Sequence, residues 1–320
     1  MYATNRPKHN TKFSFLLLFY LLFAVPLTLS YRTTKVINFA HANFITYGAY
    51  VAVFLNGLLG NKSLLLASLL AFLVSGTLAI VSYFFVFKPL EKRGASMSLI
   101  MISSMGLWIM YNYLLYMLAD IAHFFSGVNF VSYGRILYSD VPEITIGSLR
   151  LSSGFIAVCA TAVGMSLFFY IFLNKTSLGK AMRAVADNPV LAEISGIQRG
   201  KVITFTWLIT GGVVGVGGAI WTSFSGTVTP TTGDAMILQV FTIAFIGGLV
   251  SLLRTGIGAF VIALIENVGI SLLNAWFGVP TSFRTFLTFV ALLVILIAFP
   301  PLGAAGGLPF RYRKKRGGAK

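Results

Sequence analysis

The stretch KVINFAHANFITYGAY, residues 35–50, places three polar side chains among aromatic ones and carries no charge after its lysine. The polar residues are Asn38, His41 and Asn43. The rest of the chain is strongly apolar: 57% of its 320 residues are hydrophobic, 10% are charged and the mean hydropathy is +0.86. A soluble domain has roughly 45–50% apolar and about 25% charged residues, so this composition predicts a membrane protein.

Apolar runs near the ~20 residues that cross a bilayer as a helix recur along the chain. They lie at 13–30, 39–59, 63–87, 97–118, 151–173, 202–224, 236–250, 256–277 and 286–299. We therefore expect an all-α polytopic bundle of about eight or nine transmembrane helices. It would form one domain at residues 13–300, between a basic N-terminal tail at 1–12 and a basic cytoplasmic tail at 301–320.

The formal net charge of +16 does not predict nucleic-acid binding, because the basic residues lie in short segments between apolar runs. Membrane lipid is the expected surrounding. The single cysteine, Cys159, lies in an apolar run and excludes an internal disulfide or a thiolate metal site. His9, His41 and His123 are too scattered to predict a metal site, and the chain lacks the nucleotide loop GxxxxGK[ST].

Lys and Arg mark the cytoplasmic side of a membrane protein. They collect at 31–36, 88–94, 174–201 and 251–255 and after residue 300, which predicts that these segments face the cytoplasm. A crossing first helix would then begin outside, although Arg6, Lys8 and Lys12 precede it. Either this segment is a cleaved signal peptide, with Thr28 and Ser30 before the cut, or the first or second segment enters without crossing. We expect a retained helix and leave its direction open.

Two long loops differ in character. The outer loop, 119–150, carries Asp120, Asp140 and Glu143, and is either a small cap or docking surface or an ordinary solvated loop. The inner loop, 174–201, has a helix-favouring run, a break at Asn188-Pro189, and a second short run ended by Gly196. This pattern predicts a rigid cytoplasmic projection that serves as a docking element, since a loop that only sets topology needs no such order.

Small residues and one acid stand out within the apolar runs. Gly211, Gly215 and Ala219 recur every fourth residue, a spacing that predicts close packing of transmembrane helices. Glu266 lies well inside a predicted span, where a carboxylate costs ~2.5–3.5 kcal/mol and is by default a functional candidate. The alternative is a structural hydrogen bond between helices, with Asn267 or Asn274 as possible partners.

Three stretches in the same order resemble one family, the branched-chain amino-acid permeases of ABC importers, LivH type. Residues 35–50 resemble its NFAHGxxxxxGAY signature, SLGKAMRAVADNPVLAEISGI resembles its inner loop, and FTIAFIGGLVSLLRTGIGAFVIALIENV resembles its glycine-rich segment that ends in an acid. The resemblance covers residues 35–303. Ala42 replaces the usual glycine of the signature, and Val250, Leu253 and Arg254 depart from the glycine-rich pattern, which leaves the substrate less certain than the class.

The resemblance implies an ABC importer permease fold and a transport subunit that is not itself an enzyme. The partners implied are a second permease subunit of similar fold, two cytoplasmic ATP-binding subunits that use the ATP, and an extracytoplasmic solute-binding protein. No cofactor is expected on this chain. The cargo would be branched-chain or other hydrophobic amino acids.

Two sets of residues are candidates for function. A path for a zwitterion with an apolar side chain needs hydrogen-bonding and aromatic walls with few fixed charges. The substrate-path candidates are Asn38, Phe39, His41, Asn43, Tyr47, Gly48, Gly247, Gly248 and Glu266. The ATPase-coupling candidates in the inner loop are Gly179, Lys180, Arg183, Asp187, Pro189, Ala192, Glu193 and Gly196.

Alternatives remain both for the role of residues 35–50 and for the function of the whole chain. The polar residues of 35–50 either line the path or satisfy the backbone of a kinked or re-entrant segment. An ABC permease for urea or short amides would have much the same sequence, because selectivity resides largely in the binding protein. An ion-coupled secondary transporter is less favoured, since Glu266 alone supplies a clear membrane acid, and a structural scaffold leaves the three stretches unexplained.

Overall fold

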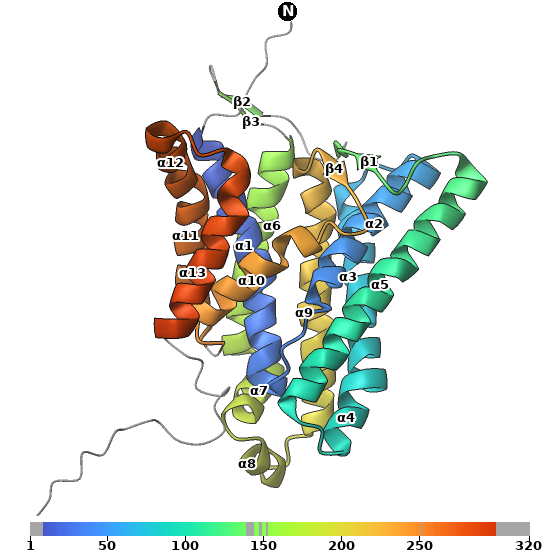
Figure 1. Ribbon diagram of the computed structural model, residues 1–320. Helices are drawn as coiled ribbons and strands as arrows, with labels where there is room; N and C mark the ends of the chain where they lie inside the picture. Colours follow the sequence, from blue (N-terminus) through green and yellow to red (C-terminus); the bar gives the residue numbers. More distant parts are fainter. Residues whose placement is uncertain (1–8, 139–143, 147–148, 152, 250, 299–320) are drawn as a thin grey trace, which may run out of the picture.

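The computed structural model describes residues 9–138, 144–146, 149–151, 153–249 and 251–298. It is a mostly helical bundle (Figure 1). The helices of the first half are α1 (His9–Thr34), α2 (His41–Leu59), α3 (Leu64–Ser82), η1 (Tyr83–Phe87), α4 (Lys88–Lys92) and α5 (Met97–Ser126). The later helices are α6 (Ser153–Lys175), α7 (Ser177–Asp187), α8 (Pro189–Ile194), α9 (Arg199–Phe224), α10 (Asp234–Ile246), α11 (Leu252–Leu264), η2 (Ile265–Gly269), α12 (Ile270–Phe277), η3 (Thr281–Phe283) and α13 (Arg284–Ala298).

The protein is a multi-pass integral membrane protein. Among the described residues, six helical runs are long and apolar enough to cross a membrane: Phe13–Thr34, His41–Leu59, Leu64–Lys92, Met97–Ser126, Arg199–Phe224 and Leu252–Phe277. Shorter apolar helices cover Cys159–Lys175, Asp234–Ile246 and Thr281–Ile297. Each apolar run of the sequence is therefore largely helical where the structure describes it, and α1 begins at His9, before the boundary expected at residue 13.

Short strands modify the all-α expectation. β1 (Tyr133–Gly134) pairs antiparallel with β4 (Thr227–Val228), and β2 (Ile144–Ile146) pairs antiparallel with β3 (Leu149–Leu151). Both small sheets lie at the end of the bundle opposite α7 and α8 (Figure 1). Because α5 continues to Ser126, the first part of the expected outer loop is helix. Two of the acids noted there, Asp140 and Glu143, lie outside the described residues.

Small residues of α9 bring it close to its neighbours, as the sequence predicted. A Cβ built on Gly48 of α2 would overlap the carbonyl oxygen of Gly215, and one built on Gly218 would overlap that of Ile45. Gly211 meets α3 in the same manner. Lipid tails give helices little hydrophobic reason to associate, so close backbone approach and van der Waals packing hold such contacts.

Two helices begin inside the bundle and not at its edge. α1 is followed by the left-handed residue Lys35, φ 58°, whose N–H donates to the Tyr31 carbonyl at 2.7 Å. The chain then returns inward in extended form, and the Phe39 N–H donates to Ser104 Oγ of α5 at 3.0 Å before α2 starts. After β4 the chain likewise turns inward to α10, where Gly233 lies against the first turns of α2. The starts of α2 and α10 therefore meet, and the second segment is the one that begins within the bundle.

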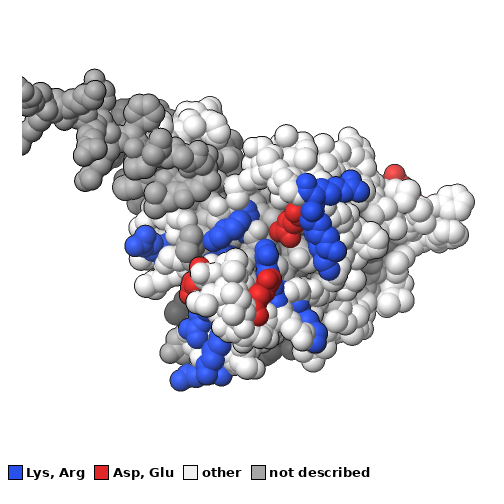
Figure 2. All heavy atoms as spheres, turned by 90° about the horizontal axis from the view of Figure 1, so that it is seen from below, with Lys and Arg blue, Asp and Glu red and all other residues white. Residues whose placement is uncertain are grey.

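The first helix packs as a central member of the bundle. Phe19 and Phe23 are fully buried, and the Phe19 ring lies edge-on to Trp221 of α9 with centroids 4.7 Å apart. This helix is therefore part of the buried core of the described bundle. α1 runs from the end opposite α7 down to the α7 end (Figure 1). Basic side chains gather on that latter face, which is the predicted cytoplasmic one (Figure 2).

Candidate functional site

Most polar side chains of residues 35–50 satisfy backbone groups. Asn38 Oδ1 accepts from the N–H two residues on at 3.0 Å, and so holds the turn into α2. His41 Nε2 bonds the Phe23 carbonyl of α1 at 2.9 Å, and the Tyr47 hydroxyl donates to the Tyr111 carbonyl of α5 at 3.1 Å. All three polar residues are buried. These contacts match the alternative in which the cluster supports an inward-starting helix.

Asn43 is the exception, because it begins a side-chain network across three helices. Its Nδ2 donates to Asn112 Oδ1 of α5 at 2.7 Å, and Asn112 Nδ2 donates to Asp234 Oδ2 of α10 at 2.9 Å. Trp108 Nε1 of α5 donates to the other oxygen, Oδ1, at 2.6 Å. Both carboxylate oxygens therefore have one donor each.

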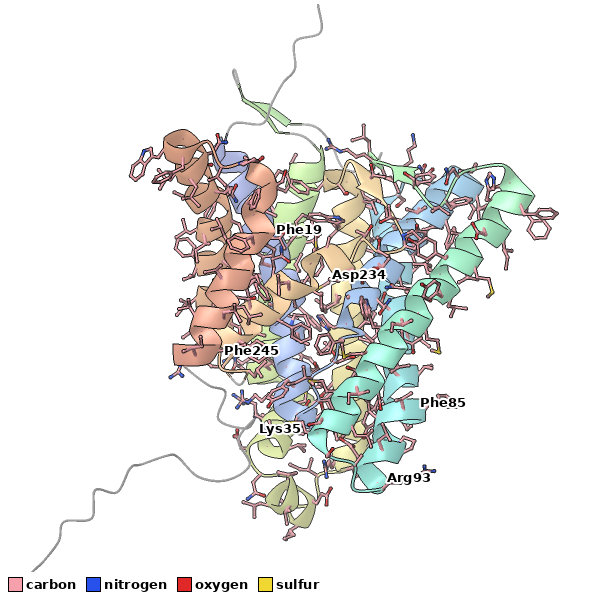
Figure 3. All side chains as sticks on the ribbon, in the orientation of Figure 1. Phe19, Lys35, Phe85, Arg93, Asp234 and Phe245 are labelled. Atoms are coloured by element: carbon pink, nitrogen blue, oxygen red, sulfur yellow. The ribbon has the colours of Figure 1, made fainter. Side chains whose placement is uncertain are left out.

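The network lies near the middle of the bundle's height. Asn112 is close to the midpoint of the 30-residue α5, so it is about 20 Å from either end of that helix. In Figure 3 the Asp234 label lies below that of Phe19 and well above those of Lys35 and Arg93 at the lower end. A carboxylate at such depth is costly and marks a solute or ion pathway by default.

The Asp234 carboxylate keeps unused capacity. It is only partly buried, and among the described residues it forms no ion pair, since the one ion pair joins Arg32 to Asp187. Asn43 Oδ1 is buried and has no hydrogen-bond partner. An ionised carboxylate offers about four lone-pair positions, so two donors leave room for a cationic or hydrogen-bonding group of a solute.

Sequence reasoning missed Asp234, Trp108 and Asn112. Asp234 follows TVTPTTG, a run rich in turn-forming residues between two apolar runs, which is typical of a surface loop. Two signals pointed to the site: an acid directly before the apolar run of α10, and a polar pair four residues apart on one face of α5. Neither signal places the two helices side by side.

The other path candidates lie elsewhere. Gly247 and Gly248 form the turn between α10 and α11, about 20 Å along α10 from Asp234. Gly247 packs against Thr255, and Gly248 has a left-handed φ of 66°. Both glycines therefore shape a turn, and the structure does not bring them to the network.

Glu266 links η2 to α1 and α13 through side-chain hydrogen bonds. It is fully buried within the π-helical turn η2 and accepts hydrogen bonds from the Tyr20 hydroxyl of α1 and the Thr288 hydroxyl of α13. The helix-to-helix hydrogen bond was the structural alternative, but its partners are not the asparagines suggested by sequence. π-helical turns are frequent at functional sites.

The inner loop forms the projection that the sequence predicted. α7 is followed by the extended Asn188, whose Oδ1 accepts from the Leu191 N–H at 3.0 Å and caps α8. Pro189 opens α8, and Gly196 follows it with a φ of 84°. The expected helix, break, helix and glycine stop are all confirmed.

The side of α8 that faces outward differs from expectation. Ala192, a coupling candidate, does not face outward: it is 3% exposed and packs in a small core with Met182 and Val202. Leu191 and Ile194 are exposed instead, at 59% and 78%. The reason is helical phase: α8 has to bury one face against its own chain, and the small alanine lies there.

The remaining coupling candidates tie the projection to the bundle or lie at its surface. Arg32 of α1 pairs with Asp187 at 3.1 Å, and Arg183 donates to Asn174 Oδ1 of α6 at 3.1 Å. Gly179 lies tightly against the last turns of α6, where a Cβ would overlap backbone. Lys180 and Glu193 are exposed.

Within the described residues, His, Cys, Asp and Glu side chains form no group of three or more that would hold a metal ion. The bundle of long apolar helices, with a polar network at mid-depth and a helical projection at one end, defines an integral membrane protein of the transport class. The chain belongs to the family described as the permease component of the branched-chain amino acid transport system, whose model matches residues 11–297.

Relatives agree with this assignment. The chain is 30% identical over 288 residues to a Methanocaldococcus jannaschii protein named probable branched-chain amino acid transport permease protein LivH, covering 89% of this chain and 88% of that one. It is 26% identical to the Pseudomonas aeruginosa permease protein BraD, named for a high-affinity branched-chain amino acid transport system, over 90% and 91% of the two chains. A shorter match, 26% identical over 152 residues, is to the ribose import permease protein RbsC of Bacillus subtilis. No solved structure matches the chain.

Proposed function

We propose that this chain is the membrane-spanning subunit of an ABC importer and forms the path for branched-chain or other hydrophobic amino acids. A solute-binding protein would deliver the substrate outside, and two cytoplasmic ATP-binding subunits would drive transport. A second permease subunit of similar fold would complete the path. The family and the names of the relatives support this proposal, as do six long and three shorter apolar helices that together allow eight or nine crossings.

One observation carries the proposal. The chain has no nucleotide loop, yet α7 and α8 form a rigid projection on the basic face with exposed apolar residues at its tip. Exposed apolar residues rimmed by charge are typical of a protein interface. The projection therefore gives external ATPases a place to act on the bundle.

Reconstitution tests the proposal directly. The chain is placed in proteoliposomes with the ATP-binding, permease and binding proteins encoded beside it, and uptake of labelled leucine is measured with and without internal ATP. We expect uptake that requires ATP and continues when ionophores collapse the ion gradients. Uptake that follows an ion gradient without ATP would instead establish the secondary-transport alternative.

Within that function, we propose that Asp234 receives the ammonium group of the substrate. The carboxylate is partly exposed at mid-depth, and its two donors, Trp108 and Asn112, fix its orientation while they moderate its charge. A cationic group complements an unpaired carboxylate, whereas urea and short amides are neutral. The charge therefore favours amino acids over the neutral alternatives.

The matched variants are Asp234→Asn and Asp120→Asn, since Asp120 is an exposed acid at the outer part of α5. A hydrogen bond to a charged group contributes about 1.5–3 kcal/mol, so Asp234→Asn should lower the efficiency of leucine uptake by roughly tenfold to a hundredfold. Asp120→Asn should leave it unchanged. Unaltered leucine uptake in Asp234→Asn, in a complex whose wild-type form transports leucine, would refute this role and leave the importer assignment standing.

A further inference from the structure

An apolar groove runs along the bundle between α1 and α6. Its α1 side is a stripe of residues spaced by about four, Leu21, Val25 and Leu29, and its α6 side is the stripe Met165, Phe169 and Leu173. The start of α11, at Leu252 and Leu253, lines the groove as well. The groove has a cavity volume of about 460 Å³ and contains few polar atoms.

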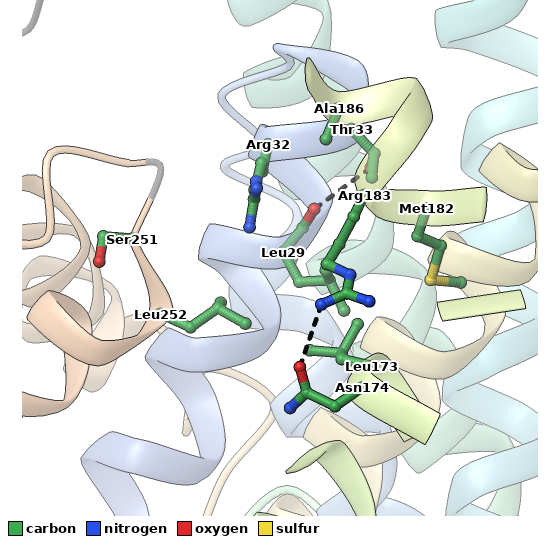
Figure 4. A pocket seen from close by; sticks show the side chains of 10 residues that line it. All are labelled: Leu29, Arg32, Thr33, Leu173, Asn174, Met182, Arg183, Ala186, Ser251 and Leu252. Carbon is green, nitrogen blue, oxygen red and sulfur yellow. Dashed lines mark hydrogen bonds between the residues drawn. The ribbon is translucent and has the colours of Figure 1, made fainter. Parts of the chain in front are cut away.

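Toward the basic face lies a second pocket of about 250 Å³, whose lining combines apolar side chains with two arginines (Figure 4). Both cavities are lined by Leu173, Asn174 and Leu252, so they adjoin. Arg32 of α1 and Arg183 of α7 line the pocket, together with the hydroxyl groups of Thr33 and Ser251. In Figure 4 Arg32 and Thr33 come from α1, Arg183 comes from α7, and Ser251 directly precedes α11.

The two arginines keep free donors. Arg32 uses Nη2 for Asp187, but its buried Nε has no partner, and Arg183 uses Nη1 for Asn174. The single carboxylate of Asp187, 71% exposed, does not neutralise two guanidinium groups. Guanidinium groups bind phosphate through parallel hydrogen bonds, so the pocket suits a phosphate.

The dimensions fit one leaflet of a bilayer. From Leu21 to Arg32 the groove follows α1 for eleven residues, which is about 16 Å at 1.5 Å per residue. Half of a hydrocarbon core of ~30 Å is close to that length. The basic end lies at the predicted cytoplasmic surface, where the headgroups of the inner leaflet are found.

We propose that this groove binds one anionic phospholipid of the inner leaflet. Its phosphate lies between Arg32 and Arg183, and an acyl chain lies along the α1 and α6 stripes. The occupant follows from the combination of features: an apolar channel one leaflet long, closed at the headgroup level by two cationic side chains. The site is separate from the Asp234 network and does not depend on which solute is carried.

The test measures which phospholipid the purified complex retains. The complex is purified in mild detergent, incubated with dioleoylphosphatidylglycerol or dioleoylphosphatidylcholine, and analysed by native mass spectrometry for retained lipid. The double variant Arg32→Gln with Arg183→Gln removes two charges from the pocket. Arg93→Gln with Lys201→Gln removes two exposed charges from other parts of the same face and serves as the control.

We expect wild type to retain phosphatidylglycerol in preference to phosphatidylcholine. The pocket variant should lose that retention by roughly tenfold or more, and the control should retain it. A second variant, Val25→Trp, fills the groove while both arginines remain, and should also lose the lipid. Equal retention of both lipids, or equal loss in pocket and control variants, would refute the site. Disulfide cross-linking of Leu253→Cys to another subunit would also refute it, because protein would then cover the groove.

Discussion

At the scale of single residues, the contact of Gly48 with Gly215 sets how closely α2 and α9 approach. A Cβ at position 48 would overlap the Gly215 carbonyl oxygen, so Gly48→Ala must push two helices apart. Overpacking of this kind costs typically ~1–3 kcal/mol. We expect a lower midpoint of thermal unfolding in detergent for Gly48→Ala. Gly106→Ala in the exposed part of α5, with open space around it, is the control and should be neutral or slightly stabilising.

Glu266 gives a second prediction at this scale. Its carboxylate accepts from Tyr20 and Thr288 inside the bundle, and a glutamine can keep both contacts because a hydroxyl also accepts hydrogen bonds. Glu266→Gln should therefore preserve much of the transport and stability. Glu266→Leu strands two buried hydroxyls, each costing about 1–3 kcal/mol, and should lower the unfolding midpoint markedly. Loss of uptake in a well-assembled Glu266→Gln complex would point to an ionised role instead.

The sequence showed which side chains are polar, but it did not show which groups these side chains contact in the fold. The polar cluster of residues 35–50 was visible in sequence, but whether His41 faces a solute or the Phe23 carbonyl depends on how α1 packs against α2. Asp234 was hidden because its turn-rich approach resembles a surface loop. Only the inward return of the chain after β4 brings it beside Asn112.

At the scale of elements, α7 and α8 were predictable because their signals are local. A capping asparagine, a proline at the first turn and a glycine after the last turn fix the boundaries without help from the rest of the fold. The exposed face was not predictable, because it depends on how α8 packs against α9. Ala192 is buried, so Ala192→Trp should disrupt the projection itself and not only its docking.

The exposed tip gives the sharper prediction for ATPase coupling. Leu191→Asp with Ile194→Asp changes two outward side chains that contribute little to the core, so the unfolding midpoint should hardly change. The charges should nevertheless prevent an apolar interface from forming. We expect the ATP-binding subunits to be lost on co-purification and uptake to stop. The control Lys201→Ala removes an exposed charge and should keep both; normal co-purification of the tip variant would exclude this docking surface.

At the scale of the whole molecule, hydropathy predicted which segments are helical. It did not predict where each helix begins in the bundle, and this decides how much of the bundle's height a helix covers. Residues 39–59 and 236–250 read as spans, yet α2 and α10 begin within the bundle where their starts meet. Such inward starts are possible because protein surrounds the extended segments and satisfies their backbone groups, as Ser104 does for Phe39.

Orientation of the whole bundle is therefore open to direct measurement. Lys35, Arg93 and α8 lie at one end of the bundle, whereas the loop after α2 lies at the other, since the helical run from Leu64 to Lys92 spans about 40 Å between them (Figures 1 and 3). In a Cys159→Ser background, we expect a membrane-impermeant thiol reagent on intact cells to label Asn61→Cys and not Lys35→Cys or Glu193→Cys. All three positions are exposed, so access depends on the membrane alone, and permeabilised cells provide the positive control.

Because Lys35 follows α1 directly, its protection also requires the first helix to begin outside, despite the basic residues before it. Labelling of Glu193→Cys from outside would reverse the orientation and remove the basis for ATPase docking at α8.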